Sequence, residues 1–350
     1  MNTDSRTVFT EPALEADLIV IDTHHHLHDK PGIEHKIGRT GRFLVEEYAQ
    51  LVDSGHRVVA SICVEARAMY RADGPEEFKC VGETEFLNGQ AAMAASGLYG
   101  PCRVGAGIVA YADLRRGDAI QPVLEAHLEA APQRMRGIRY EGAWDEDESI
   151  VGWLFDCGPK VYADADFLRG FRHLQRLGLS FDAFVLSPQI PDVEALARRF
   201  PDTAIIFNHL GIPVGVGRHQ GKLQEEFPRW REDVKTLARC ENVTVKLGGL
   251  GSFITSFPSY QANPPASSEQ LASEWRPYVE TAIEAFGAER CMWESNLPTD
   301  ASGHFATVCN AFKRLVGRCS RSERQAVFAG TAVRVYRLAL PGLAAVGGSL

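Results

Sequence analysis

Residues Leu18–His26 read LIVIDTHHH, a short apolar run that ends in three consecutive histidines. The run is too short for a buried helix and is followed by polar residues, so it predicts a buried strand. Further runs of this kind recur along the chain, each bounded by Gly, Pro, Asp or Asn. They are Arg57–Cys63, Arg103–Val109, Met135–Tyr140, Leu179–Val185, Thr203–Phe207, Val243–Leu247 and Cys291–Glu294. Together they predict eight strands.

Helical patterns, with apolar residues at i, i+3 and i+4, follow these runs. They cover Gly41–Ser54, Glu85–Ser96, Ile120–Ala131, Ala165–Leu177, Val193–Phe200, Glu225–Arg239, Glu269–Phe286, Ala306–Leu315 and Ser322–Leu338. Strands that alternate with helices indicate a parallel sheet, and eight such units predict a closed (β/α)8 TIM barrel in the α/β class. An open doubly wound sheet is the alternative, but no GxGxxG follows the first strand.

We therefore predict one barrel domain over residues 17–338, with poorly ordered tails at residues 1–16 and 339–350. Two segments, 65–84 and 248–268, are longer than ordinary loops. Both follow predicted strands, so we expect them at the C-terminal face of the barrel, where barrel active sites are built. The second loop contains Phe253, Phe257 and Tyr260, which suggests a partly apolar or ring-shaped ligand.

The composition excludes several classes of protein. The 350 residues include 37 basic and 45 acidic side chains, a net charge of -8, so no global attraction to nucleic acid or anionic membranes is expected. No apolar run approaches the roughly 20 residues of a membrane span. The eight cysteines form no CxxC pair, and the polar N-terminus resembles neither a signal nor a transit peptide. We expect reduced thiols and a cytoplasmic protein.

The histidines after the first predicted strand are the strongest chemical signal. Strand alternation puts Asp22, His24 and His26 on one side and His25 on the other. If the first side faces the barrel axis, two imidazoles meet at its mouth. Neutral imidazoles suit Zn, Fe or Mn, whereas protonated ones suit an anion. The alternative is a set of surface histidines in a turn.

Two later motifs add candidates at the same face. His209, in NHLGIP after the sixth strand, has the parity to face inward with Ile205 and Phe207. Glu294 and Asn296, in MWESNLPTD at the eighth strand, share one face. A carboxylate at a barrel mouth is a candidate general base or metal ligand, although a rim ion pair is an equal alternative for Glu294.

Weaker candidates lie in or after other strands. Arg139 and Lys246 are cations in predicted strands, and a cation inside a barrel needs a counter-charge or an anionic ligand. Asp182 and Glu65 are available as either partner. Gln189 lies in a loop position from which it is expected to reach a substrate.

In this order, the motifs resemble the amidohydrolase-related ("amidohydrolase 2") branch of the amidohydrolase superfamily from about Asp17 to Leu338. They are IDTHHHLHD, GIRYEGAWD, LSFDAFVLSPQIPDVEALARRFPDT, NHLGIP, VKLGGLG, CMWESNLPTD and GTAVRVYRL. The resemblance implies a (β/α)8 barrel with hydrolase chemistry at the C-terminal mouth. Sugar lactonases and 2-pyrone-4,6-dicarboxylate lactonases are the most similar groups, and metal-dependent decarboxylases are more distant. His24 and His26 match the family's HxH motif, and His209 matches its histidine after the sixth strand.

The sequence departs from the family at two strands. The aspartate expected at the end of the eighth strand is Asn296, and the fifth strand of metal-rich members carries a histidine where Asp182 lies in this chain. Asparagine neither accepts a proton from water nor compensates a metal charge. Four explanations stay open. Glu294 or Asp300 takes the role, His209 is the base, Asn296 contacts substrate in a relocated site, or the chain binds a ligand without hydrolysing it.

The sequence therefore predicts a hydrolase of a lactone or, less favoured, an amide, with a small-molecule substrate attacked by water. His24, His26 and His209 polarise the carbonyl or hold one divalent metal, Zn or Mn. Glu294 or Asp300 accepts the water proton, and Arg139 and Lys246 neutralise a carboxylate on an acidic substrate. The alternatives are a metal-dependent carboxy-lyase and a non-catalytic binding barrel.

Overall fold

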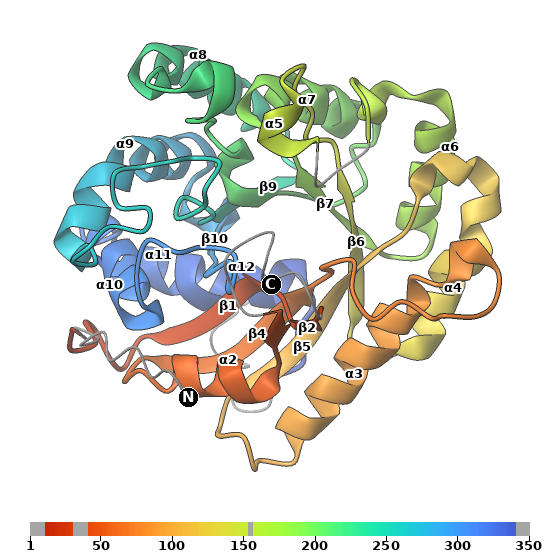
Figure 1. The fold of residues 1–350 in the computed structure, drawn as a ribbon, viewed down its shortest axis with the longest axis horizontal. Coiled ribbons are helices and arrows are strands. Elements are labelled where there is room, and N and C mark those ends of the chain that lie inside the picture. The colour runs from red at the N-terminus through yellow and green to blue at the C-terminus, as the bar shows by residue number, and fades with distance from the viewer. Residues whose placement is uncertain (1–10, 31–40, 153–156, 341–350) are drawn as a thin grey trace.

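Eight parallel strands follow one another round a single sheet in chain order (Figure 1). The computed structural model describes residues 11–30, 41–152 and 157–340. The strands of the barrel are β1 (Ile19–His25), β4 (Arg57–Val64), β5 (Arg103–Tyr111), β6 (Met135–Glu141), β7 (Ser180–Phe184), β8 (Ile205–Phe207), β9 (Val243–Leu247) and β10 (Cys291–Trp293). Each coincides with a predicted apolar run, and the (β/α)8 TIM-barrel prediction is confirmed.

Helices cover the outside of this sheet (Figure 1). They are α2 (Val45–Val52), α3 (Val81–Ala95), α4 (Gln121–Ala130), α5 (Glu148–Val151), α6 (Ala165–Arg176), α7 (Ile190–Arg199), α8 (Leu223–Leu237), α9 (Ser268–Phe286), α10 (Phe305–Leu315), α11 (Arg321–Gln325) and α12 (Thr331–Val335). The predicted helix at 41–54 starts late because β3 (Arg42–Phe43) pairs with β2 (His28–Asp29). The predicted helix at 322–338 is interrupted by a π-helical turn, Ala326–Gly330.

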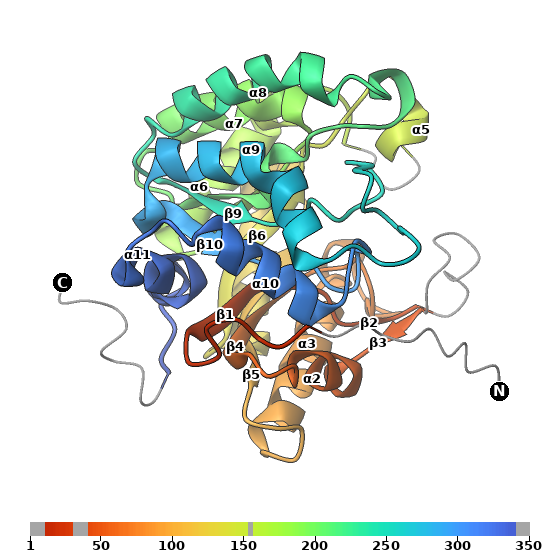
Figure 2. The same cartoon turned by 90° about the vertical axis from the view of Figure 1, so that its left-hand side faces the viewer.

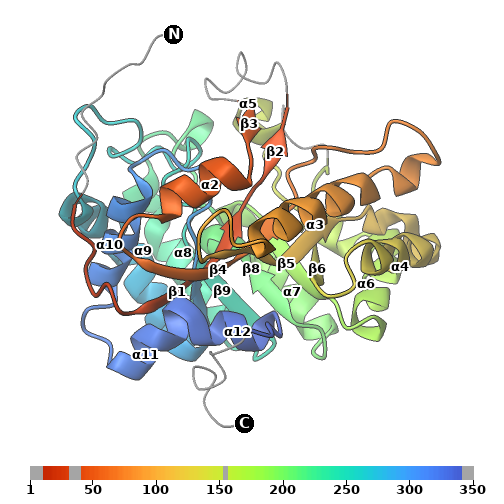
Figure 3. The ribbon, with the colours of Figure 1, turned by 90° about the horizontal axis from the view of Figure 1, so that it is seen from below.

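The barrel interior and the helix-covered exterior are separate apolar clusters. The interior cluster joins residues of five strands to the C-terminal segment: Ile21, Ala60, Ile62, Val64, Val109, Ile206 and Met292 contact Ala329, Ala332, Tyr336 and Leu338. Views from two directions place α11 at the end of the barrel opposite α5 and the β2–β3 pair (Figures 2 and 3). The C-terminal segment therefore closes the N-terminal end of the barrel and leaves the other end to the loops.

The seam between β1 and β10 is closed by a few hydrogen bonds rather than by a strand ladder. His25 and Leu297 form an isolated bridge. The amide of His26 donates to the carbonyl of Leu297 at 2.7 Å, and the amide of Asn296 donates to the carbonyl of His24 at 2.8 Å. The closure therefore passes through the segments that carry the candidate site residues.

The described part of the predicted N-terminal tail is packed, contrary to expectation. The Glu11 carboxylate accepts from the amide of Ser268 at 2.7 Å, and Lys313 Nζ donates to the carbonyl of Leu14 at 2.7 Å. Residues 1–10 and 341–350 lie outside the described residues. All eight cysteines are free thiols. Among the described helices, none has the length and apolarity needed to cross a membrane.

Candidate active site

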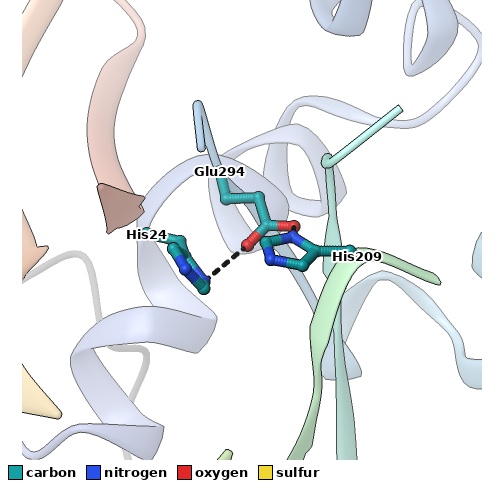
Figure 4. Close-up of side chains that lie close together, drawn as sticks. All are labelled: His24, His209 and Glu294. Atoms are coloured by element: carbon teal, nitrogen blue, oxygen red, sulfur yellow. Dashed lines mark hydrogen bonds and ion pairs between the residues drawn. The ribbon is translucent and has the colours of Figure 1, made fainter. Parts of the chain in front are cut away.

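Three side chains, one from β1 and the others from the segments directly after β8 and β10, converge at the C-terminal end of the barrel (Figure 4). Glu294 lies between two imidazoles: its Oε1 is 2.6 Å from His209 Nδ1, and its Oε2 is 3.2 Å from His24 Nδ1. The candidate ligand atoms of the three residues lie within 4.8 Å of one another. None of them is more than 2% exposed. Predicted from scattered motifs, His24, His209 and Glu294 form one buried cluster.

A bulge in β1 brings His24 to the interior. Along the pairing with β4, Asp22 is opposite Ser61 and His25 is opposite Cys63, so three steps on β1 match two on β4. One extra residue on a strand reverses the side that the following residues face. As a result Asp22 faces outward, where it accepts from Tyr48 Oη at 2.9 Å, while His24 faces inward. The prediction that Asp22 shares a side with His24 was wrong because alternation does not reveal a bulge.

His209 reaches the cluster by a turn and not by strand parity. Ile205 and Phe207 belong to the exterior core and Ile206 to the interior, so the predicted inward face of β8 was wrong. The backbone of His209 has a left-handed φ of 54°, as does the next residue, Leu210, at 57°. This rare conformation redirects the imidazole toward Glu294.

Two glycines after β9 leave room for the cluster. A Cβ on Gly249 would lie 2.4 Å from the Cβ of His209, and one on Gly248 would lie 2.2 Å from Cγ of Glu294. Such distances are far below van der Waals contact. The VKLGGLG motif therefore supplies backbone against which both side chains pack.

His26 lies beside the cluster and contacts it through the ring of His24. Its ring centroid is 4.9 Å from that of His24, which in turn is 4.5 Å from that of His209, so the three histidines do converge. However, His26 Nδ1 lies 3.0 Å from the carbonyl oxygens of Val64 and Glu65, to which it donates. In the group of possible metal ligands, Glu294 takes the place predicted for His26.

Arg139 and Lys246 flank His24, and each has a carboxylate of its own. Arg139 Nε is 2.6 Å from Glu65 Oε1, and Arg139 Nη1 is 3.2 Å from His24 Nε2. Lys246 Nζ is 2.7 Å from Asp182 Oδ2 and 3.2 Å from His24 Nδ1. Glu65 and Asp182 are therefore counter-ions, and the predicted role of both cations in neutralising a substrate carboxylate lacks the free charge it requires.

The electrostatics of the cluster keep His24 neutral. Burial lowers the pKa of His24 well below its ordinary value, and the Lys246 ammonium lowers it further. Burial alone would raise the pKa of Glu65, but Arg139 and Arg67 outweigh it and lower the value. A neutral imidazole offers one N–H and one lone pair. Arg139 Nη1 faces His24 Nε2 and Lys246 Nζ faces His24 Nδ1; because both cations can only donate, the single lone pair of the ring accepts from one of them.

The other predicted residues serve the loops. Asp300 accepts from the amide of Gly251 at 2.9 Å and from Asn296 Nδ2 at 2.7 Å, which joins the loop after β9 to the loop after β10. Gln189 Nε2 donates to the carbonyl of Trp144 at 2.6 Å, and its Oε1 accepts from the amide of Leu186 at 3.1 Å. These contacts give Asp300, Asn296 and Gln189 positions in the loop framework.

Sequence reasoning missed a second group of carboxyls beside Glu65. Glu141 Oε2 is 2.6 Å from Arg67 Nη2, and burial together with Glu65 raises the pKa of Glu141 to about 7. Burial also raises the pKa of Glu83 to about 8. Glu141 had a visible signal, because it lies two residues after Arg139 on the same strand face. Glu83 had none, since it looks like an ordinary helix residue.

The residues present fit a divalent metal. Two imidazoles and one carboxylate are ligands typical of Zn or Mn sites. Oε2 of Glu294 is buried, and its 3.2 Å contact with His24 lacks hydrogen-bond geometry, so among the described residues this oxygen has no hydrogen-bond donor. A buried carboxylate oxygen left in this way is suited to a cation or to a substrate donor.

Comparison with known proteins identifies the family of this chain. The family model described as Amidohydrolase matches residues 21–338. The uncharacterised protein y4mH of Sinorhizobium fredii is 32% identical over 92% of this chain and 100% of its own length. An L-fucono-1,5-lactonase of Burkholderia multivorans is 28% identical over 92% of this chain and 97% of its own. The crystal structure of an amidohydrolase from B. multivorans with bound zinc superposes with a TM-score of 0.68, at 26% identity, covering 92% of this chain and 100% of that one.

Proposed function

The chain belongs to the amidohydrolase family, and on this premise we propose that it hydrolyses a lactone, a small cyclic ester, at the C-terminal mouth of its barrel. The observation that carries the proposal is Glu294, held between the imidazoles of His24 and His209. Ester hydrolysis needs an acceptor for the proton of the attacking water and positive charge near the carbonyl oxygen. The cluster offers the acceptor, and the flanking Arg139 and Lys246 offer the positive charge. A lactonase is also among the relatives aligned over nearly the whole chain.

The hydrogen bond between His209 and Glu294 assigns a role to each. When His209 donates from Nδ1 to Glu294, as their separation of 2.6 Å allows, its Nε2 carries the lone pair. This nitrogen then accepts the proton of a water whose oxygen attacks the lactone carbonyl. The ring C–O bond breaks, and the alcohol oxygen takes this proton from the His209 imidazolium, which restores the neutral base. Glu294 orients the ring and stabilises the imidazolium that forms.

Two buried cations set the field around the carbonyl. Arg139 and Lys246 both contact His24, and Glu65 and Asp182 are their counter-ions. Their ion pairs mean that the site does not need a carboxylate on the substrate. We therefore propose a neutral lactone in preference to the acidic lactone that free cations would have required.

His24, His209 and Glu294 are also the residues that would hold a divalent cation such as Zn or Mn. A bound cation of this kind supplies Lewis-acid polarisation of a carbonyl and lowers the pKa of water. Elemental analysis of protein purified without chelator distinguishes a ligand role for these side chains from the base and partner described above.

The direct test is to measure the hydrolysis of a panel of sugar lactones and unsubstituted lactones. An indicator dye reports the protons released, and the rate of spontaneous ring opening is subtracted. Glu294→Gln should lower kcat/KM by about 10²-fold or more, because it removes the carboxylate that orients the base, His209, and stabilises its imidazolium. Glu129→Gln, on the exposed face of α4, is the matched control and should leave kcat/KM unchanged.

Two results would contradict the proposal. Release of carbon dioxide from hydroxybenzoates, without lactone hydrolysis, would assign a decarboxylase. Binding of lactones without turnover, in protein with and without added Zn or Mn, would assign a binding protein.

A further inference from the structure

Tyr336, in the C-terminal GTAVRVYRL motif, enters the barrel from the end opposite the candidate site. It follows α12 and is fully buried. Its neighbours in the interior cluster are all aliphatic or methionine side chains, among them Ile206 and Met292. The C-terminal segment closes this end of the barrel (Figures 2 and 3). Tyr336, on this C-terminal segment, therefore points along the barrel interior toward the site.

The Tyr336 hydroxyl reaches the carboxylate that holds Lys246. Tyr336 Oη lies 3.2 Å from Asp182 Oδ2 and 3.4 Å from Oδ1. The same Oδ2 accepts from Lys246 Nζ at 2.7 Å and from Asn208 Nδ2 at 3.0 Å. Lys246 Nζ also lies 5.6 Å from the centroid of the Tyr336 ring. A continuous set of contacts thus runs from Tyr336 of the C-terminal segment through Asp182 and Lys246 to His24.

Packing alone does not explain the hydroxyl. Phenylalanine would fill the same volume among these apolar neighbours, whereas a buried hydroxyl costs about 1–3 kcal/mol unless it has a partner. The described partner is Asp182. Burial and the Asp182 charge raise the pKa of Tyr336 well above its ordinary value, so the hydroxyl keeps its proton and donates.

We infer that Tyr336 is a positioning residue for the site: its hydroxyl helps to fix the Asp182 carboxylate, which holds the Lys246 ammonium against His24. Tyr336 touches neither His209 nor Glu294 in the described contacts, and its hydroxyl acts through Asp182. The inference about catalysis rests on the proposed lactone hydrolysis, but the inference about geometry does not.

The test compares Tyr336→Phe with Tyr278→Phe. Tyr278 is a buried tyrosine of α9 whose hydroxyl donates to the carbonyl of Leu223 at 3.5 Å, away from the site. Both variants are examined by thermal unfolding, by lactone kinetics and by NMR of the imidazole nitrogens. The His24 signals are assigned from their loss in His24→Gln.

Tyr336→Phe should shift the His24 signals and lower kcat about tenfold, the size expected for one hydrogen bond to a charged group, with KM within about twofold. Tyr278→Phe should do neither. Asp182→Asn should shift the same signals, and adding Tyr336→Phe to it should change kcat less than about twofold. A loss of thermal stability in Tyr336→Phe with unmoved His24 signals would reduce Tyr336 to packing and overturn the inference.

Two further outcomes remain decisive. If the wild type hydrolyses no lactone, the proposed function fails, and the His24 signals alone decide the role of Tyr336. If Tyr336→Phe does not fold, Asp182→Asn keeps the tyrosine in place and removes its charged acceptor. Unmoved His24 signals in Asp182→Asn would then overturn the inference.

Discussion

Asn296 stands where the family resemblance predicts an aspartate, and its amide has a definite partner. Asn296 Nδ2 donates to Asp300 Oδ1 at 2.7 Å. Asn296→Asp would place two carboxylates at this distance, where they must share a proton. We therefore expect Asn296→Asp to lower the free energy of unfolding by about 1–3 kcal/mol at pH 8 instead of adding lactonase activity. Urea unfolding measures this change.

The shared proton also determines how the stability of Asn296→Asp changes with pH. In the folded variant one of the two carboxyls has a raised pKa, so the folded chain binds more protons and its stability falls as the pH rises above about 4. The loss should be smaller at pH 5 than at pH 8. Exchanging the pair, as Asn296→Asp with Asp300→Asn, restores one carboxylate and one amide and should restore stability. Full stability of the single variant at pH 8 would show that the contact is unimportant.

The histidines and Glu294 could be predicted to meet, because each follows a strand and parallel strands end at one face. The route by which they meet could not be predicted. The bulge after Asp22 and the left-handed backbone of His209 are set by contacts with other strands. The alternation of side chains along a single strand does not indicate either feature. The pairing of Arg139 with Glu65 and of Lys246 with Asp182 was one of two possibilities that charge alone left open.

At the scale of elements, the loop after β9 is shaped by the cluster beside it. Gly249 has a left-handed φ of 70°, and a Cβ there would lie 2.4 Å from the Cβ of His209. Gly249→Ala should therefore displace His209 and lower kcat/KM by at least about tenfold, as loss of a positioned base would. The matched control is Gly89→Ala in α3, where a Cβ meets nothing within 4 Å. Unchanged kinetics in Gly249→Ala would mean that His209 does not need its present position.

The loop after β4 is held by a carboxyl that stays protonated. Glu83, in α3, accepts from the amides of Ala66 at 2.7 Å and Ala68 at 3.2 Å. Burial raises its pKa from 4.5 to about 8. Between these values the folded chain binds a proton that the unfolded chain has lost, so the contribution of Glu83 to stability falls as the pH rises.

Glu83→Gln removes this titration and keeps an oxygen for the two amides. Its free energy of unfolding relative to the wild type should rise between pH 5 and pH 8 by more than about 1 kcal/mol, because one pKa unit corresponds to about 1.4 kcal/mol. Urea unfolding at three pH values measures the slope. Glu129→Gln, an exposed change, should give a difference that does not vary with pH. A flat difference for Glu83→Gln as well would rule out a protonated Glu83.

At the scale of the whole molecule, the periodic runs were enough to predict the barrel. Each strand has a local apolar signal, and the alternation of strands and helices permits few other topologies. The two ends of the chain were less predictable. Residues 11–16 pack on α9 and α10, and Tyr336 fills the barrel interior, through contacts that join residues far apart in the sequence. No local pattern encodes such contacts.

A buried carboxylate, Asp22, adds side-chain hydrogen bonds to the seam between the first and last strands. Asp22 Oδ1 accepts from the amide of Ser295 at 2.9 Å, and its Oδ2 accepts from Ser295 Oγ at 2.6 Å and from Tyr48 Oη at 2.9 Å. Together with the isolated bridge between His25 and Leu297 and the bond from Thr23 Oγ1 to the carbonyl of Trp293 at 2.8 Å, these bonds hold His24 of β1 beside Glu294, which directly follows β10. The seam is therefore where stability and the geometry of the site depend on the same contacts.

Asp22→Ala leaves the amide and hydroxyl donors without their acceptor and should lower the free energy of unfolding by about 3 kcal/mol or more. Hydrogen exchange should rise first in the amides of His26 and Asn296, which bridge the seam, before those of β6 and β7. Asp202→Ala, at an exposed position, should change neither measurement. Ser295→Ala removes one of the donors, so its effect should be smaller in the Asp22→Ala background than in the wild type. Strictly additive losses would show that Asp22 and Ser295 act independently, and that the closure of the barrel does not depend on the contact between them.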